Sequence, residues 1–203
     1  MNTLRRQIFG LPVAVFIGAT SGCRAMDVGA GGPGMMLVYG SVIDGKRVSI
    51  KKANLPDGRS FPQPGGIGGS FKGGQTWLNG GIDATMATSG DHRELPEWVD
   101  FEWSEPPYPE DPNMSLEAYR ALPRQKQRLE IKRRIPPAVV EEAIASKRVA
   151  QPGKVADKTL WIYIFWTPDG MKMRWAMRDR ATGGPFGEIV REGGDDLDRY
   201  NLK

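Results

Sequence analysis

The side chains with the strongest catalytic potential are scarce in this chain. His92 is the only histidine and Cys23 the only cysteine among 203 residues. A Cys/His zinc site, a disulfide framework and a Cys–His pair with a free thiol all need more of these residues. His92 lies in a polar turn between Asp91 and Glu94, where it could act as a general base oriented by a carboxylate. A lone histidine in a charged turn is usually solvated, and the chain has no G-x-S-x-G nucleophile motif, so we do not expect a hydrolase.

Carboxylates near aromatic side chains offer a second possible chemistry. Asp100, Glu102 and Glu105 lie near tryptophans, and paired carboxylates catalyse glycoside hydrolysis. On the outer face of a strand, however, such residues are more often part of the solvated surface. The run from Gly29 to Gly34 fits G-x-G-x-x-G, but it follows an apolar leader rather than a strand, so no dinucleotide site is predicted. We therefore expect no enzymatic activity, no cofactor and no metal ion.

Residues 1–22 have the features of a bacterial lipoprotein signal peptide. Arg5 and Arg6 precede a mostly apolar run over residues 8–17, which is too short to span a bilayer comfortably, and small residues follow. Cys23 ends the sequence Ala-Thr-Ser-Gly-Cys, which resembles a lipobox. We expect lipidation of Cys23; a plain secretory signal with a chance cysteine is the alternative. A diacylglycerol and an N-acyl chain together form a strong membrane anchor.

Processing at Cys23 also changes the charge of the protein. Residues 1–22 hold two of the 28 basic side chains and no acid, so 26 basic and 24 acidic side chains remain, a formal charge of +2. This small excess does not indicate nucleic-acid binding. Arg24, rather than Asp, follows the cysteine, a pattern that in Gram-negative lipoproteins indicates release to the outer membrane. We expect a cell-envelope protein that faces the periplasm.

The elements that must position these side chains are mostly strands. Residues 98–103 alternate between an apolar face of Val99, Phe101 and Trp103 and an acidic face of Asp100 and Glu102. Residues 160–166 are β-branched and aromatic throughout and predict a central strand buried on both faces. A Pro-Asp-Gly turn leads into residues 171–178, a half-buried return strand with Met173 and Trp175 facing the core.

The remaining elements are shorter. We expect a hairpin of residues 35–43 and 46–51, strands at 82–86, 129–135 and 186–190, a short helix capped by Ser115 and a longer helix that begins at Pro137. The glycine-rich residues 56–81 form either a mobile loop or irregular backbone packed closely on another element. The predicted fold is α+β, mainly an antiparallel sheet that is sandwich-like or curled, with one main helix. The predicted organisation is a signal peptide at 1–22, a lipidated tether at 23–34 and one periplasmic domain at 35–203.

Several of these features together resemble a known family. The leader with Cys23, the glycine-rich middle, Leu95-Pro96 before the tryptophan strand, the Pro-led helix and the strand at 160–166 with its Pro-Asp-Gly return resemble bacterial lipoproteins of unknown function grouped as the DUF 2931 type. The resemblance covers most of the chain from about Gly65 to Val190, and its motifs are structural rather than catalytic. Some proteins of this kind lie beside type VI secretion phospholipase effectors, which implies an immunity role as an association only.

Charge patterning gives the most specific hypothesis about a binding surface. Residues 91–111 hold eight acids and one arginine, whereas residues 120–134 hold seven basic side chains and one glutamate. These groups either pair within the fold, for example with Arg128 or Arg133, or form an interface. For an interface we expect the partner-binding residues to be Trp77, Asp91, Glu94 and Glu97, which would contact a toxic effector protein. The alternative is an envelope-maintenance lipoprotein that binds glycan, lipid or an outer-membrane protein.

Overall fold

The structure, a computed structural model, describes residues 32–68, 82–88, 94–150, 155–183 and 186–200. All of the described residues belong to one compact unit, Gly31–Lys203. Cys23, Trp77, Asp91 and His92 lie outside the described residues.

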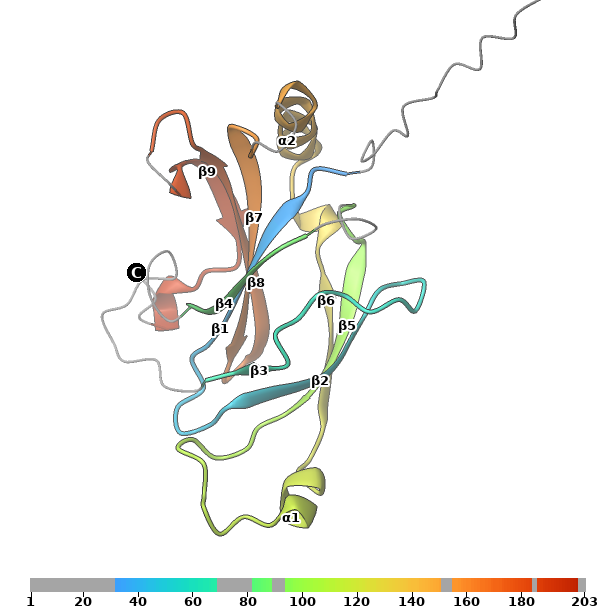
Figure 1. Cartoon of the computed structure of the whole chain (residues 1–203), viewed down its shortest axis with the longest axis vertical. Helices are drawn as coiled ribbons and strands as arrows, with labels where there is room; N and C mark the ends of the chain where they lie inside the picture. Colours follow the sequence, from blue (N-terminus) through green and yellow to red (C-terminus); the bar gives the residue numbers. More distant parts are fainter. Residues whose placement is uncertain (1–31, 69–81, 89–93, 151–154, 184–185, 201–203) are drawn as a thin grey trace, which may run out of the picture. The chain divides into compact units, whose positions relative to one another are not determined.

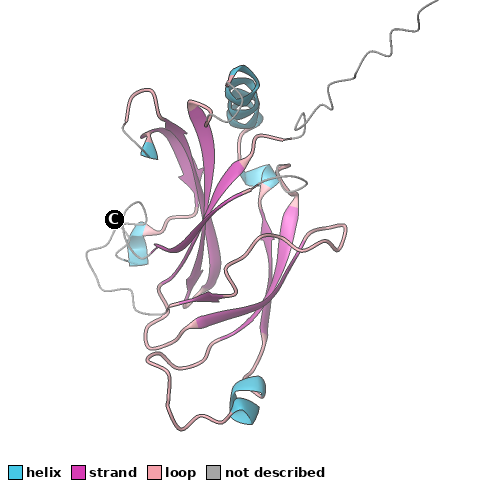
Figure 2. Cartoon of the chain, in the orientation of Figure 1, coloured by secondary structure: helices cyan, strands magenta, loops and turns pink. Residues whose placement is uncertain are grey.

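Two sheets and one main helix make the fold α+β with mainly antiparallel strands, as predicted (Figures 1 and 2). The larger sheet has the order β4-β1-β7-β8-β9 and the smaller sheet the order β3-β2-β5-β6. The strands of the larger sheet are β1 (Met35–Ser41), β4 (Ile82–Ala87), β7 (Lys158–Thr167), β8 (Gly170–Asp179) and β9 (Glu188–Gly194). Those of the smaller sheet are β2 (Val48–Asn54), β3 (Gly66–Ile67), β5 (Trp98–Ser104) and β6 (Gln125–Glu130).

Both α-helices of the described residues begin where the sequence indicates. Helix α1 (Leu116–Arg120) has Ser115 as its N-cap, whose hydroxyl accepts a hydrogen bond from the Ala118 amide. Helix α2 (Pro137–Val149) has a proline in its first turn, where a missing amide donor costs nothing, and packs beside β7 (Figure 1). Short 3-10 helices lie at Lys132–Arg134 and Asp198–Tyr200.

The strand β7 lies at the centre of the larger sheet. It pairs with β8 as an antiparallel hairpin, closed at Thr167 and Gly170, and with β1 in a parallel arrangement. Eight consecutive residues at its end are buried, which confirms the prediction of a strand covered on both faces. Gly170 has a φ of 94°, a conformation that favours glycine at this turn.

The main core lies between the two sheets. Inward side chains of β1, β7 and β8 meet those of β2 and β5, and Val139 and Ala143 of α2 join them. The Trp166 ring is the centre of an aromatic group with the rings of Tyr39, Phe101 and Trp103. As predicted, Val99, Phe101 and Trp103 face this core; they are 0%, 2% and 2% exposed.

A second apolar cluster covers the other face of the larger sheet. It contains Val38, Trp161, Tyr163, Phe165, Ala176 and Leu197. The buried Arg178 guanidinium donates hydrogen bonds to the Tyr163 hydroxyl and the Gly187 carbonyl and lies over the Trp161 ring. The return strand β8 is therefore buried on both faces at Ala176 and Arg178, and the prediction of a half-buried strand is wrong there.

Three further strand predictions need correction. The predicted hairpin does not form, because β1 and β2 belong to different sheets although Gly45 turns the chain between them with a φ of 66°. The strand predicted at 129–135 lies earlier, at Gln125–Glu130, and a 3-10 helix follows it. The last strand runs from Glu188 to Gly194 rather than over 186–190. Among the described helices, none is long and apolar enough to cross a bilayer.

Candidate functional site

The two described residues of the predicted partner-binding group lie at one pocket. Glu94 and Glu97 precede β5 and line a pocket of about 220 Å³ together with the loop that follows β2. Both glutamates are exposed, whereas Leu95 between them and Phe61 across the pocket are buried. The pocket therefore has an apolar base and a charged rim. Trp77 and Asp91, the other two predicted residues, lie outside the described residues.

Ion pairs occupy the rim of this pocket. The Lys132 ammonium lies 2.6 Å from a Glu97 carboxylate oxygen, and this contact, chiefly its hydrogen bond, raises the pKa of Lys132. On the other side, the Arg59 guanidinium lies 2.7 Å from the Asp57 carboxylate. The acids of this region thus alternate with cations, and the rim is zwitterionic rather than acidic.

Ion pairs also extend across the smaller sheet. They show whether the acids of residues 91–111 pair with the basic residues of 120–134 within the fold. Arg128 forms two hydrogen bonds with Asp100, each 2.8 Å long. Arg124 lies 2.7 Å and Lys126 3.5 Å from the Glu102 carboxylate. The acids of β5 and the basic residues of β6 are cross-strand neighbours, so the charged segments pair within the fold. Arg133, which the sequence offered as a partner for the acids at 91–97, instead contacts Glu130.

These contacts also determine the protonation of the carboxyl groups. Hydrogen bonds from Arg128 lower the pKa of Asp100, and a hydrogen bond from Arg124 lowers the pKa of Glu102. A glycosidase needs one carboxylic acid with a raised pKa that can donate a proton near neutral pH. Asp100 and Glu102 lack this property and are both ion-paired. Glu102 is only 8% exposed, so the expectation that it belongs to the solvated surface is wrong. Glu105 accepts hydrogen bonds from the Trp103 indole and from Gln125.

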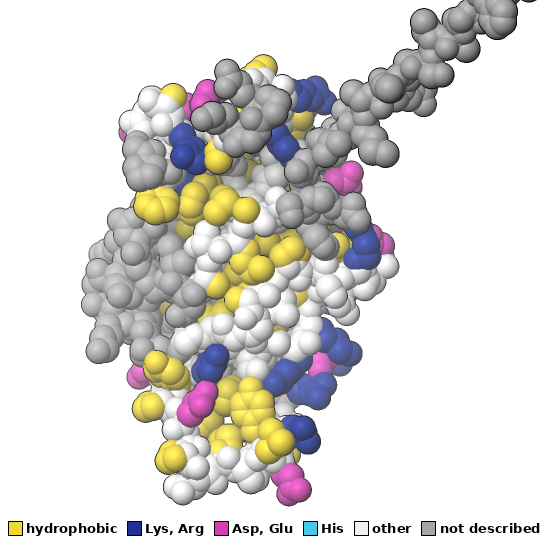
Figure 3. All heavy atoms as spheres, viewed as in Figure 1, with side chains coloured by type: hydrophobic (Ala, Val, Ile, Leu, Met, Phe, Trp, Pro, Cys, Tyr) yellow, Lys and Arg dark blue, Asp and Glu magenta, His cyan; other side chains and the backbone are white. Residues whose placement is uncertain are grey.

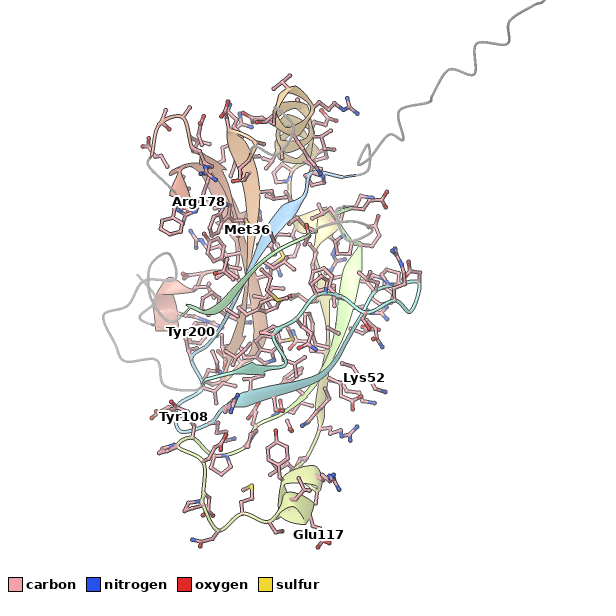
Figure 4. The ribbon with its side chains drawn as sticks, in the orientation of Figure 1. Met36, Lys52, Tyr108, Glu117, Arg178 and Tyr200 are labelled. Carbon is pink, nitrogen blue, oxygen red and sulfur yellow. The ribbon has the colours of Figure 1, made fainter. Side chains whose placement is uncertain are left out.

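A second groove lies at α1, and little in the amino-acid pattern indicates it. It measures about 380 Å³ and is lined by the proline-rich segment after β5 and by α1. The Tyr119 hydroxyl lies 2.8 Å from the Ser49 hydroxyl and joins α1 to β2, while Leu116 remains 62% exposed. Tyr108, which Figure 4 labels in the preceding loop, is 41% exposed. The only sequence signal for this surface was an apolar residue in a short helix.

The described residues contain no group of three or more His, Cys, Asp or Glu side chains arranged to hold a metal ion.

Comparisons with known proteins found no matching family model, no matching curated protein and no matching solved structure.

Proposed function

We propose that the protein is a lipid-anchored binding protein of the bacterial periplasm that acts as an immunity protein. It would neutralise a toxic antibacterial effector, such as a phospholipase, by direct protein–protein contact. The observation that carries the proposal is the position of the only cysteine, Cys23, directly after a basic and apolar leader. That position supports acylation of the cysteine, and an acyl anchor would hold the protein where envelope-acting effectors work.

The geometry of the described charged groups supports binding rather than catalysis. Asp100 and Glu102 are engaged in ion pairs with arginines, and their lowered pKa values suit fixed charges. Fixed charges on a rigid sheet steer and orient a partner without any chemical step.

The pocket beside Glu94 and Glu97 is the contact region that we propose for the effector. Its rim presents charges of both signs, and its apolar base includes Leu95 and Phe61. An anchor side chain that enters such a pocket supplies most of the affinity, and the charged rim supplies specificity.

A pair of variants tests this proposal. The combined change of Trp77→Ala and Glu94→Arg should weaken binding of the effector by about 2–4 kcal/mol without unfolding the domain, because it removes an anchor and reverses a rim charge. The matched control His92→Ala should leave protection intact. The measurements are the affinity of the purified complex and cell survival during effector production. Loss of protection in His92→Ala, with normal binding by the double variant, would favour a catalytic mechanism instead.

A second candidate function is an envelope-maintenance lipoprotein that binds glycan, lipid or an outer-membrane protein. An excess of cations on the outer face of the smaller sheet favours it. An effector gene beside the gene for this protein would support immunity, and its consistent absence would support maintenance. Mass spectrometry of proteins that the Cys23-deleted domain captures from the native envelope would separate the two.

A further inference from the structure

The outer face of the smaller sheet carries two rows of charged and polar side chains that run across its strands. The strand register aligns Lys52 of β2 with Glu102 of β5 and Lys126 of β6. The next row aligns Asn54, Asp100 and Arg128 in the same way. Each row places an acid on the central strand and at least one cation on a flanking strand.

A β-bulge adds another cation to this face. The pairing of β2 with β5 shifts between Ile50 and Lys52, so that Lys51 has no direct partner on β5. In a regular strand, consecutive side chains point to opposite faces, and one of two neighbouring lysines would enter the core. The bulge allows both Lys51 and Lys52 to be exposed. The Lys51 ammonium lies 4.6 Å from the centre of the Tyr119 ring and thus connects the basic face to α1.

Several cations of this face are more accessible than Glu102, whereas Asp100 is 44% exposed against 50% for its partner Arg128. The Lys126 side chain is 74% exposed and that of Arg124 55%, whereas the Glu102 side chain below them is 10% exposed. The face contains five cations and three carboxylates, a net charge of +2, from Lys51, Lys52, Arg124, Lys126 and Arg128 against Asp100, Glu102 and Glu130. We call these eight residues the basic face. In Figure 3, Lys and Arg side chains gather over the part of the molecule where Figure 4 labels Lys52.

Two features of the basic face limit what it can bind. A groove of about 460 Å³ runs along it, between cations of β2 and β6. The Arg128 guanidinium lies 3.5 Å from the centre of the Trp98 ring, so this aromatic face is covered and does not offer a stacking platform for a sugar. Three cations, Lys52, Lys126 and Arg128, line the groove together with Asp100 and Glu102, so that cations rather than an aromatic platform are what it offers to a ligand.

An exposed apolar side chain adjoins the basic face. Leu116 lies one helical turn before Tyr119 on α1, and Tyr119 contacts Ser49 and Lys51 of β2. Leu116 is 62% exposed and lines the groove at α1. Long cationic side chains beside an exposed apolar residue are typical of proteins that lie on anionic membranes, where cations meet lipid phosphates and the apolar group enters the interface.

We propose that the basic face, together with Leu116, docks on the surface of a bilayer that contains anionic phospholipids. This contact is separate from the lipid chains on Cys23 and from the effector-binding pocket. It orients the domain, because the smaller sheet then faces the membrane.

The test uses residues 31–203, the compact unit that contains every described element and both apolar clusters and lacks the acylation site. Sedimentation with vesicles measures its binding to phosphatidylcholine alone and to phosphatidylcholine with about a third phosphatidylglycerol. We expect binding only to the anionic vesicles, weakening as salt screens the charges. The change of Lys52→Glu with Lys126→Glu should weaken this binding about 30-fold or more.

Matched variants separate the basic face from overall charge. Arg148→Glu with Arg180→Glu changes the net charge equally at two exposed positions outside the basic face, and it should bind nearly as well as the parent. Leu116→Asp should weaken vesicle binding while the fold, followed by circular dichroism, is unchanged. No binding to anionic vesicles, equal binding to neutral ones, or equal losses in the two double variants would overturn the proposal. If free glycerol phosphate at millimolar concentration displaced the domain from vesicles, and Leu116→Asp did not change vesicle binding, the basic face would bind free phosphate compounds rather than a membrane surface.

Discussion

The indole of Trp175 links the two sheets of the domain and gives the most quantitative prediction. Trp175 is 5% exposed and lies in the main core. Its Nε1 donates a hydrogen bond of 3.0 Å to the carbonyl of Arg134, in the 3-10 helix that follows β6. Truncation of a buried tryptophan to alanine leaves a cavity that costs about 3–5 kcal/mol. The unpaired Arg134 carbonyl adds about 1 kcal/mol or more. We expect Trp175→Ala to lower the free energy of unfolding by about 4–6 kcal/mol.

Trp166 provides a matched control for the hydrogen bond. Its ring is fully buried, and its Nε1 has no hydrogen-bond partner within the described part of the chain. Replacement by phenylalanine removes a similar volume at both positions, but it breaks a hydrogen bond only at Trp175 and removes an unsatisfied donor at Trp166. Trp175→Phe should therefore cost about 2 kcal/mol more than Trp166→Phe.

Equilibrium unfolding in urea, followed by circular dichroism, measures both differences. A loss below about 1 kcal/mol for Trp175→Ala would mean that the side chain lies on the surface. Equal losses for the two phenylalanine variants would show that the Arg134 carbonyl contributes nothing through this bond.

Three further predictions concern other contacts. Gly193→Ala should destabilise the domain by about 1–3 kcal/mol, because its Cβ would lie 2.9 Å from Cζ2 of Trp175, and this added cost should vanish in a Trp175→Ala background. Burial alone would raise the pKa of Asp195, but hydrogen bonds from Arg134 and the Met173 amide outweigh it and leave this pKa below its usual value. Its stabilising contribution should thus be complete above about pH 4 and decline as the pH falls through the lowered pKa; unfolding curves of Asp195→Asn should lack this part of the pH dependence. Cys23→Ser should abolish palmitate labelling and retention by lipid in the membrane fraction, and labelling that survives the change would exclude Cys23 as the acylation site.

The elements with a clear hydrophobic period could be predicted from the sequence, but their partners could not. The alternation of Val99, Phe101 and Trp103 correctly identifies the buried face of β5. When apolar and acidic residues alternate along a strand, only the apolar face is expected to face the core. Asp44-Gly45, between the two strands of the predicted hairpin, is an equally clear turn signal, yet it reports only a local reversal of the chain. Whether β1 and β2 then pair depends on competition from β4 and β7, which lie far away in the sequence.

Polar strands and charged sites were predicted less well, because they lack an apolar pattern. Leu129 is the only apolar residue of β6, so a hydrophobic pattern cannot indicate this strand, which is stabilised by charge pairs with β5. The sequence raised the pairing of acids with basic residues as one of two alternatives, and the strand register shows this pairing for Asp100 and Glu102. The β-bulge at Lys51 has no signal in composition, and the basic face became evident only from the strand register.

The position of β1 has a mechanical consequence for any pull on the chain that precedes it. β1 begins at Met35 and is hydrogen-bonded on both edges, to β7 in parallel from Met35 to Ser41 and to β4 in the antiparallel direction. Because these hydrogen bonds lie across the strand axis, a force along β1 shears them together instead of opening them one by one. Tension from the N-terminal side is thus carried by β1 and must strain two strand pairs at once before the core opens.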